Sequence, residues 1–273
     1  MKKIIFTLSF IFLTILGFSQ KPDMILIEGG SFYLGNDYSL KAFNEKPEHK
    51  VTISDFYMSK YEVTFEMFDN FCNTTGFPKT NDGGYGRDKK PVINISWIGA
   101  VKYCNWLSIQ NGYDRVYELS IDTSGTTIKG IDWNASGYRL PTEAEWEYVA
   151  KGGNDSKGYA YPGSNNPDEI AWYFTNSNSS PHDVGTKKPN ELGIYDISGN
   201  AYEWCNDIYN AEYYSEMVEN NPKGPDSGNH KVYRGGNFNS TLDFLRISKR
   251  YSLAQNLTTG LIGIRLVQQN IGQ

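Results

Sequence analysis

Near the N-terminus of the chain, short apolar runs separated by polar turns predict β-strands. Met24–Glu28 and Ser31–Leu34 are two such runs. The Gly29-Gly30 pair between them predicts a hairpin, because both glycines accept positive φ. Val51–Ile53 and Phe56–Met58 predict two more strands. The pattern therefore indicates a small sheet built from brief strands.

Two segments further along carry helical signals at both ends. Thr64 is a suitable N-cap for a helix from Phe65 to about Thr75, and Gly76 ends it. A second helix is predicted to begin after Ser96 and to end at Gly112. Its apolar positions recur at three- and four-residue spacing, at Trp97, Val101, Cys104 and Leu107.

The third predicted helix has the clearest start signal. Thr142 and Glu145 form a capping box, and Gly152 follows the last helical residues. Beyond Gly152 the chain is rich in Gly, Asn, Ser, Pro and aromatic residues, with few periodic runs and no repeat. We therefore expect one α+β domain over residues 20–273, with a core made largely by aromatic residues on loops. Long ordered loops of this kind often carry binding sites.

Composition and charge exclude two classes of protein. The 273 residues include 26 basic and 31 acidic side chains, a formal net charge of −5. An acidic chain without a basic block is a poor candidate for binding nucleic acid, which requires clustered Lys and Arg. Three cysteines are too few for a disulfide scaffold, and an odd number cannot all pair internally.

Residues 1–19 have the pattern of a secretory signal. Lys2 and Lys3 give a positive start, Ile4–Leu16 is an apolar stretch of 13 residues, and Gly17-Phe18-Ser19 offers a cleavage site. The apolar stretch is shorter than the ~20 residues that a membrane-spanning helix needs. We expect a periplasmic or secreted protein without a membrane span. Removal of the signal leaves 24 basic and 31 acidic residues, a net charge of −7.

Six sequence motifs carry a family resemblance. Along the chain they are MILIEGG (24–30), GYRLPTEAEWEY (137–148), NELGIYD (190–196), SGNAYEW (198–204), YRGG (233–236) and GIR (263–265). In this order they resemble the formylglycine-generating enzyme, or sulfatase-modifying factor, family over nearly the whole mature chain. The resemblance implies a variant of the C-type-lectin-like fold: loop-rich, with a small antiparallel sheet and a few helices.

The resemblance also implies a chemistry that this chain lacks the groups to perform. Catalytic members oxidise a cysteine of a sulfatase to formylglycine with oxygen and a copper ion held by two cysteines, because thiolates suit Cu(I). The two cysteine positions fall at Ser240 and Leu245. We therefore predict no catalytic residue there and no copper. An iron centre, as in another branch of the family, is also not expected, because His49, His182 and His230 show no metal-ligand spacing.

Calcium is the metal that the resemblance favours. The family's Gly-Asn loop binds Ca²⁺ through backbone carbonyls and a glutamate, which here implies the carbonyls of Ser198, Gly199 and Ala201 and the carboxylate of Glu203. Hard oxygen donors from an irregular loop suit Ca²⁺. The alternative interpretation is that Glu203 pairs with an arginine and that Trp204 fills the core.

The C-terminal segment 237–256 is the candidate binding surface, because in catalytic relatives the substrate peptide enters there. We predict contacts to a protein or peptide, such as a partner in the cell envelope, from Asn237, Phe238, Asn239, Ser240, Thr241, Asp243, Phe244 and Arg246. In the alternative interpretation Phe238 and Phe244 belong to the core. The chain is thus predicted to be a binding or accessory protein. Two other functions remain: an oxidase with a rearranged site, and a receptor diversified by a retroelement.

Charged residues within the motifs are expected to be structural. Arginines at 139, 234 and 265 are predicted to form buried ion pairs and to bind loop carbonyls, which suits a guanidinium with five donors. Glutamates at 143, 145 and 147 lie at the start of the third helix, where cap and dipole roles are expected.

Overall fold

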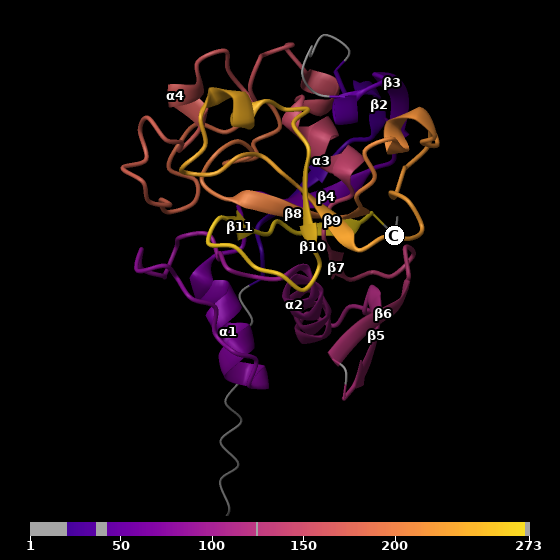
Figure 1. Cartoon of the computed structure of the whole chain (residues 1–273), viewed down its shortest axis with the longest axis vertical. Coiled ribbons are helices and arrows are strands. Elements are labelled where there is room, and N and C mark those ends of the chain that lie inside the picture. Colours follow the sequence, from indigo (N-terminus) through magenta and orange to yellow (C-terminus); the bar gives the residue numbers. More distant parts are fainter. Residues whose placement is uncertain (1–20, 37–42, 124, 271–273) are drawn as a thin grey trace, which may run out of the picture.

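Two four-stranded sheets lie at the centre of the protein (Figure 1). The computed structural model describes residues 21–36, 43–123 and 125–270, so the expected signal segment and its cleavage site lie outside the described residues. The first sheet has the order β1-β4-β12-β7 and is antiparallel throughout. Its strands are β1 (Met24–Ile27), β4 (Phe56–Ser59), β12 (Val267–Gln269) and β7 (Tyr138–Arg139).

The second sheet has the order β10-β9-β8-β11, and its β8–β11 pair is parallel. Its strands are β10 (Tyr251–Ala254), β9 (His230–Arg234), β8 (Tyr202–Ile208) and β11 (Ile262–Gly263). Two further pairs stand apart, β2 (Gly30–Leu34) with β3 (His49–Ile53) and β5 (Tyr117–Asp122) with β6 (Gly125–Ile131). Short sheets joined by long loops give the α+β fold that the sequence predicts.

The three predicted helices are confirmed together with their caps. They are α1 (Phe65–Thr75), α2 (Trp97–Gln110) and α3 (Glu143–Ala150). The Thr142 side chain accepts a hydrogen bond from Glu145 N, and Glu145 Oε2 accepts one from Thr142 N at 2.8 Å, so the capping box is complete. The chain also forms a short helix α4 (Pro167–Ile170) and 3-10 turns at Phe43–Glu45, Gly153–Asp155, Tyr213–Ser215 and Leu242–Leu245.

The predicted hairpin at Gly29-Gly30 is wrong. β1 pairs with β4 and β2 pairs with β3, so the two glycines connect different sheets. A Cβ atom at Gly29 would lie 2.3 Å from the carbonyl oxygen of Ile53, and Gly29 N donates to Asp55 Oδ1 at 2.8 Å. Gly29 is therefore needed for a close approach of two backbones and not for a turn.

The protruding hairpin β5–β6 was not predicted from the sequence. Within β5 only Tyr117 is buried, and Ile121 is 73% exposed. Burial alternates along β6, but polar residues such as Thr127 and Lys129 separate its few apolar ones, so the sequence pattern that identifies a strand is weak.

The core lies on both sides of the second sheet. In Figure 1, α1 and α2 lie below this sheet and α3 lies above it. Trp97 and Trp204 are fully buried on the side of α1 and α2, and Trp146 is fully buried on the side of α3. The indole nitrogen of Trp204 donates to the Ile95 carbonyl at 2.9 Å. Aromatic side chains thus fill the core around the motif loops, as expected.

Candidate functional site

Buried arginines fix the base of the segment 237–256 to α3. Arg234 Nη1 donates to Glu143 Oε1 at 3.0 Å, and Nη2 donates to Glu147 and to the Ile247 carbonyl. Arg250 donates to both oxygens of Glu143 at 2.7 Å. The predicted buried ion pair of Arg234 is confirmed. Glu143 and Glu147 serve this network, and only Glu145 has the predicted cap role.

Ser240 and Leu245, the two positions at which we expected the family cysteines, hold side chains that support the loop. Ser240 is 5% exposed, and its hydroxyl oxygen accepts from the backbone N and the side-chain Nδ2 of Asn237, each at 3.0 Å. Leu245 is fully buried in a cluster with Ile170 and Tyr173. Within the described part of the chain, neither position offers a thiol. A hydroxyl and an alkyl group are not ligands for Cu(I).

The three cysteines of the sequence are free and buried at other places. They are Cys72, Cys104 and Cys205. Burial raises the pKa of the Cys72 thiol to about 11, and it also raises the pKa of the Cys104 and Cys205 thiols. Because the thiolate is the reactive form, these side chains behave as small apolar groups at neutral pH.

Only part of the predicted contact set lies on the surface. Asn239, Thr241, Asp243 and Phe244 are exposed and Arg246 is half-buried, whereas Asn237, Phe238 and Ser240 are buried. These last three are removed from the surface for a local reason. Asn237 Oδ1 accepts from Asn239 N at 2.7 Å, and the resulting turn directs Phe238 inward against Tyr85. Of the two phenylalanines, Phe238 belongs to the core and Phe244 does not.

Phe244 begins a stack of aromatic rings, which we call the aromatic ladder: Phe244, Tyr251, Tyr233 and Tyr202. The Phe244 and Tyr251 rings are nearly parallel, with centroids 6.1 Å apart, and Tyr251 stacks on Tyr233 at 5.2 Å. Tyr202 meets Tyr233 edge to face at 5.0 Å. Its hydroxyl lies 3.4 Å from Ser240 Oγ. The aromatic ladder therefore extends from the surface to Ser240.

Sequence reasoning missed the three tyrosines of the aromatic ladder. Tyr233 and Tyr251 are register partners on β9 and β10. Their stacking follows from this pairing, because side chains directly opposite in an antiparallel pair lie close together. The sequence did contain a local signal, since Tyr233 belongs to the YRGG motif. Its stacking partner, however, depends on the pairing of β9 with β10, which the pattern of apolar residues did not reveal.

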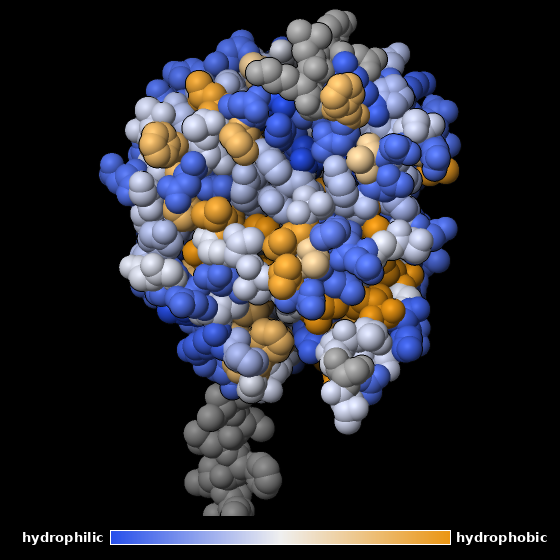
Figure 2. All heavy atoms as spheres, in the orientation of Figure 1, coloured by the Kyte–Doolittle hydropathy of each residue, from blue (hydrophilic) through white to orange (hydrophobic). Residues whose placement is uncertain are grey.

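Charged groups surround the outer end of the aromatic ladder. Asp243 Oδ1 accepts from Arg246 Nε at 3.0 Å, and Lys249 Nζ lies 3.6 Å from Asp243 Oδ2. Slight burial raises the pKa of Asp243, but the hydrogen bond and charge of Arg246 outweigh it and hold that pKa below its usual value. Figure 2 shows that this face is mostly hydrophilic, with hydrophobic side chains gathered in a band over β10 and β11.

The loop 198–204 is fixed by a buried ion pair. Glu203 is fully buried and accepts from Arg265 Nη2 at 2.6 Å and from the Trp146 indole nitrogen at 2.8 Å. Arg265 Nε lies 3.0 Å from each Glu203 oxygen. The predicted ion pairing of Arg265 is confirmed, and Trp204 fills the core. Both carboxylate oxygens of Glu203 thus already accept hydrogen bonds. This agrees with the alternative interpretation, in which Glu203 pairs with an arginine.

Two more buried carboxylates lie near Arg265. Glu62 accepts from Asn200 Nδ2 at 2.7 Å and from Ala201 N at 3.0 Å. Asp196 Oδ2 accepts from Gly185 N at 2.7 Å, whereas its Oδ1 is buried and has no hydrogen-bond partner among the described residues. Burial, followed by the charges of Asp196 and Glu203, raises the pKa of Glu62 well above its usual value.

Burial also raises the pKa of Asp196 to about 6. Glu62, Asp196 and Glu203 therefore surround one guanidinium, an excess of negative charge that we call the acid cluster. An orphaned carboxylate oxygen in such a place suits a hard cation. The donor would be Asp196, which the sequence analysis did not include. Among the described residues, no group of three or more His, Cys, Asp or Glu side chains is placed to hold a metal ion.

The fold has clear relatives among solved structures. The structure of Treponema denticola variable protein 1 superimposes with a TM-score of 0.77 at 30% identity, over 90% of this chain and 94% of that one. The architecture is thus the C-type-lectin-like fold of the formylglycine-generating enzymes, as the sequence motifs implied.

Sequence comparison then identifies the family. Residues 17–270 match the family model described as sulfatase-modifying factor enzyme 1-like domain, and the chain belongs to this family. Chaperone protein LppX of Paenibacillus barcinonensis is 35% identical, over 83% of this chain and 82% of LppX. Formylglycine-generating enzyme of Bos taurus is 29% identical, over 81% of this chain and 67% of the enzyme. The chain spans only 35% of a matching relative, serine/threonine-protein kinase Pkn1 of Chlamydia trachomatis.

Proposed function

We propose that this protein is a non-catalytic member of its family that binds a protein or peptide partner on the exposed part of the segment 237–256. The proposal is supported by the side chains at the two positions where we expect the family's copper ligands. Ser240 and Leu245 occupy the two positions and are engaged in loop support. Without two thiolates at this place, the copper-dependent oxidation of a cysteine has no metal site.

The geometry of the surface supports a role in recognition. Phe244 is 41% exposed, and its ring is held parallel to Tyr251 on a segment that Arg234 and Arg250 fix to α3. A rigid aromatic group with a charged rim is the usual composition of an interface hot spot, because little side-chain entropy is lost on binding. Asp243 and Lys249 supply that rim.

A relative that is not named as an oxidase supports a role in protein binding. LppX is named a chaperone protein, and it aligns with this chain over most of its length. We infer that the partner is another exported or envelope protein, and that the chain acts in the periplasm or outside the cell. Among the described residues, no helix is long and apolar enough to cross a membrane.

The test is peptide selection against matched variants. A phage-displayed random peptide library is selected on the purified chain, and the enriched peptides are titrated onto Phe244→Ser. Ile121→Ser is the control, because Ile121 is 73% exposed on β5 and lies outside the segment. We expect the first variant to lose affinity by about tenfold or more and the second to keep it. Equal affinities for both variants would exclude this surface.

A second readout addresses catalysis. The protein is incubated with copper, oxygen and a cysteine peptide of the sulfatase motif, and the peptide mass is measured. We expect no change. Conversion of the thiol to an aldehyde would overturn the proposal and establish an oxidase with a rearranged site.

A diversified receptor is a second candidate, favoured by the likeness to Treponema denticola variable protein 1. In such a protein the exposed positions of the segment 237–256 would vary among copies, while buried ones such as Phe238 and Leu245 would not. The test is genomic. A neighbouring reverse-transcriptase gene with a template copy that differs at adenines supports this function, and the absence of both removes it.

We also propose that Ca²⁺ binds beside the acid cluster, with Asp196 as its one acidic ligand. The orphaned oxygen Asp196 Oδ1 and the negative charge around Arg265 support this. Calcium would supply the charge that balances the cluster and order the loop 198–204. Carbonyl oxygens of Ser198, Gly199 and Ala201 remain the expected further donors.

A further inference from the structure

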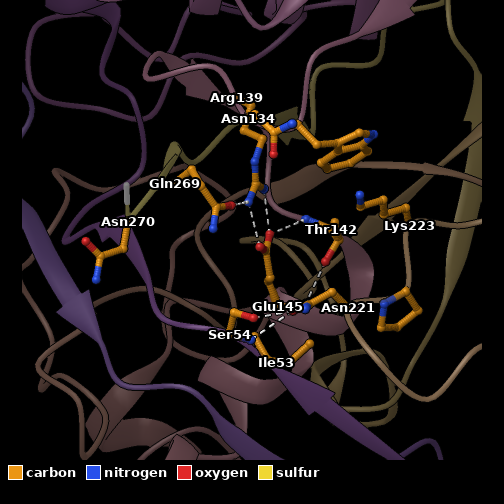
Figure 3. Close-up of a pocket in the computed structure, with 12 residues that line it drawn as sticks. Ile53, Ser54, Asn134, Arg139, Thr142, Glu145, Asn221, Lys223, Gln269 and Asn270 are labelled. Atoms are coloured by element: carbon orange, nitrogen blue, oxygen red, sulfur yellow. Dashed lines mark hydrogen bonds and ion pairs between the residues drawn. The ribbon is translucent and has the colours of Figure 1, made fainter. Parts of the chain in front are cut away.

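A cavity of about 300 Å³ opens beside β7 and β12, at the start of α3 (Figure 3). It shares none of its described lining residues with the segment 237–256 or with the acid cluster. Its volume lies at the lower end of the range of small-molecule sites and suits a single sugar-sized group. The residues that matter for its chemistry are Trp133, Asn134, Arg139, Lys223, Gln269 and Asn270.

One side of the cavity is a fixed ion pair. Arg139 is 2% exposed and donates through Nη1 and Nη2 to the two oxygens of Glu145, each at 2.7 Å. Glu145 Oε2 also accepts from Thr142 N, so the capping box fixes the pair to α3. Arg139 Nε is buried and has no hydrogen-bond partner among the described residues. The pair is therefore neutral in sum, and the Nε donor is enclosed by protein.

Lys223 gives the cavity a net positive charge. Its ammonium nitrogen lies 4.5 Å from the centroid of the Trp133 ring, and Arg139 Cζ lies 5.4 Å from the same centroid. Lys223 forms no ion pair with any described residue. Because Glu145 is already neutralised by Arg139, the ammonium of Lys223 is a charge without a counterion on a ring that orients it. A carboxylate is the natural complement.

Amide side chains make up the rest of the polar lining. Asn134 precedes β7, whereas Gln269 and Asn270 are consecutive residues at the end of β12. Asn134 and Gln269 lie beside the Arg139–Glu145 pair in Figure 3. Gln269 Oε1 lies 3.4 Å from Arg139 Nη2. An amide offers both a donor and an acceptor, and so does a hydroxyl group. Several amides around one cavity therefore favour a ligand that carries several hydroxyl groups.

We propose that this cavity binds a sugar acid, a hydroxylated ring with one carboxylate, either free or as a unit of an acidic polysaccharide. The carboxylate pairs with Lys223, and the hydroxyl groups bind the amides. An anionic sugar gives the ammonium of Lys223 a charge-assisted hydrogen bond that a neutral sugar does not supply. This inference is independent of the function proposed for the segment 237–256.

Calorimetry with a matched pair of ligands tests the proposal. D-galacturonate and D-galactose differ in the carboxylate, and we expect galacturonate to bind at least about tenfold more tightly. An oligogalacturonate that binds as tightly as the monosaccharide identifies a polysaccharide unit, whereas binding of the monosaccharide alone identifies a free sugar acid. No binding of either form at about 10 mM, or equal affinity for galactose, overturns the proposal.

Variants locate the binding within the protein. Lys223→Met removes the charge from an exposed position, and Lys188→Met is the control because Lys188 is exposed and outside the cavity. We expect galacturonate affinity to fall about tenfold in the first variant only. Trp133→Phe should abolish a ligand-induced change in tryptophan fluorescence. If Lys223→Met binds as the wild type does, the site is not this cavity.

Discussion

Asp196→Asn is predicted to stabilise the protein, although it removes a carboxylate from a motif. Burial raises the pKa of Asp196 to about 6, against an ordinary value of 3.8. A difference of roughly two pH units corresponds to about 3 kcal/mol for keeping the charged form buried. Asparagine has the same shape and keeps an acceptor for Gly185 N, but it carries no charge. The substitution should therefore raise the free energy of unfolding by up to about 3 kcal/mol at pH values at which Asp196 would be ionised.

The sign of the pH dependence follows from the raised pKa. Between about pH 4 and pH 6 the folded protein keeps a proton on Asp196 that the unfolded chain has released, so the stability from this group falls as the pH rises. The cost of the buried charge is absent below about pH 4 and fully present above about pH 6. The stability difference between Asp196→Asn and the wild type should therefore be largest at high pH.

Urea unfolding at two pH values measures this difference. With calcium removed by chelation, we expect the variant to be more stable by about 2–3 kcal/mol near pH 8 and by less than about 1 kcal/mol near pH 4.5. Titrating groups that do not interact with Asp196 occur in both proteins and cancel in the comparison, whereas Glu62 is coupled to Asp196 and contributes to the difference. A variant that is less stable at the higher pH, or a gain that is independent of pH, would refute the argument.

Three further predictions concern calcium, the arginine network and the two phenylalanines. Added Ca²⁺ should raise the melting temperature of the wild type and not that of Asp196→Asn, as measured by scanning calorimetry; equal shifts would exclude Asp196 as a ligand. Arg234→Met should cost about 3–5 kcal/mol in guanidinium unfolding, because it leaves Glu143 and Glu147 buried without a full counter-charge. Phe238→Ala should cost about 3–5 kcal/mol. Phe244→Ala should cost less than about 1 kcal/mol in the same assay, and similar costs would contradict the assigned burial.

The parts of the fold that local chemistry determines could be predicted from the sequence. Thr64, Gly76 and the Thr142–Glu145 capping box identify helix ends within a few residues, since cap hydrogen bonds are local. The strands with which β1 and β2 pair, β4 and β3 respectively, could not be predicted. Gly29 has the residue type of a turn, but it is required by the approach of a backbone more than twenty positions away.

In the candidate site too, some features follow from local chemistry and others depend on distant residues. The motif arginines pair with carboxylates as the chemistry of a buried guanidinium requires. The choice between Phe238 and Phe244 depends on the turn that Asn237 and Ser240 form, and both side chains are equally apolar in the sequence. The role of Asp196 was missed because burial, which depends on the packing of distant segments, raises its pKa.

The turn at Asn237 also separates the positions that hold the segment in place from the positions that face solvent. Asn237, Phe238, Ser240 and Leu245 are buried, whereas Asn239, Thr241, Leu242, Asp243 and Phe244 are exposed. Substitutions at exposed positions of this kind usually change stability by less than about 0.5 kcal/mol. We therefore expect the five exposed positions to accept new side chains without a change in the backbone conformation of the segment. A combinatorial library restricted to these five positions should yield folded proteins with new specificities.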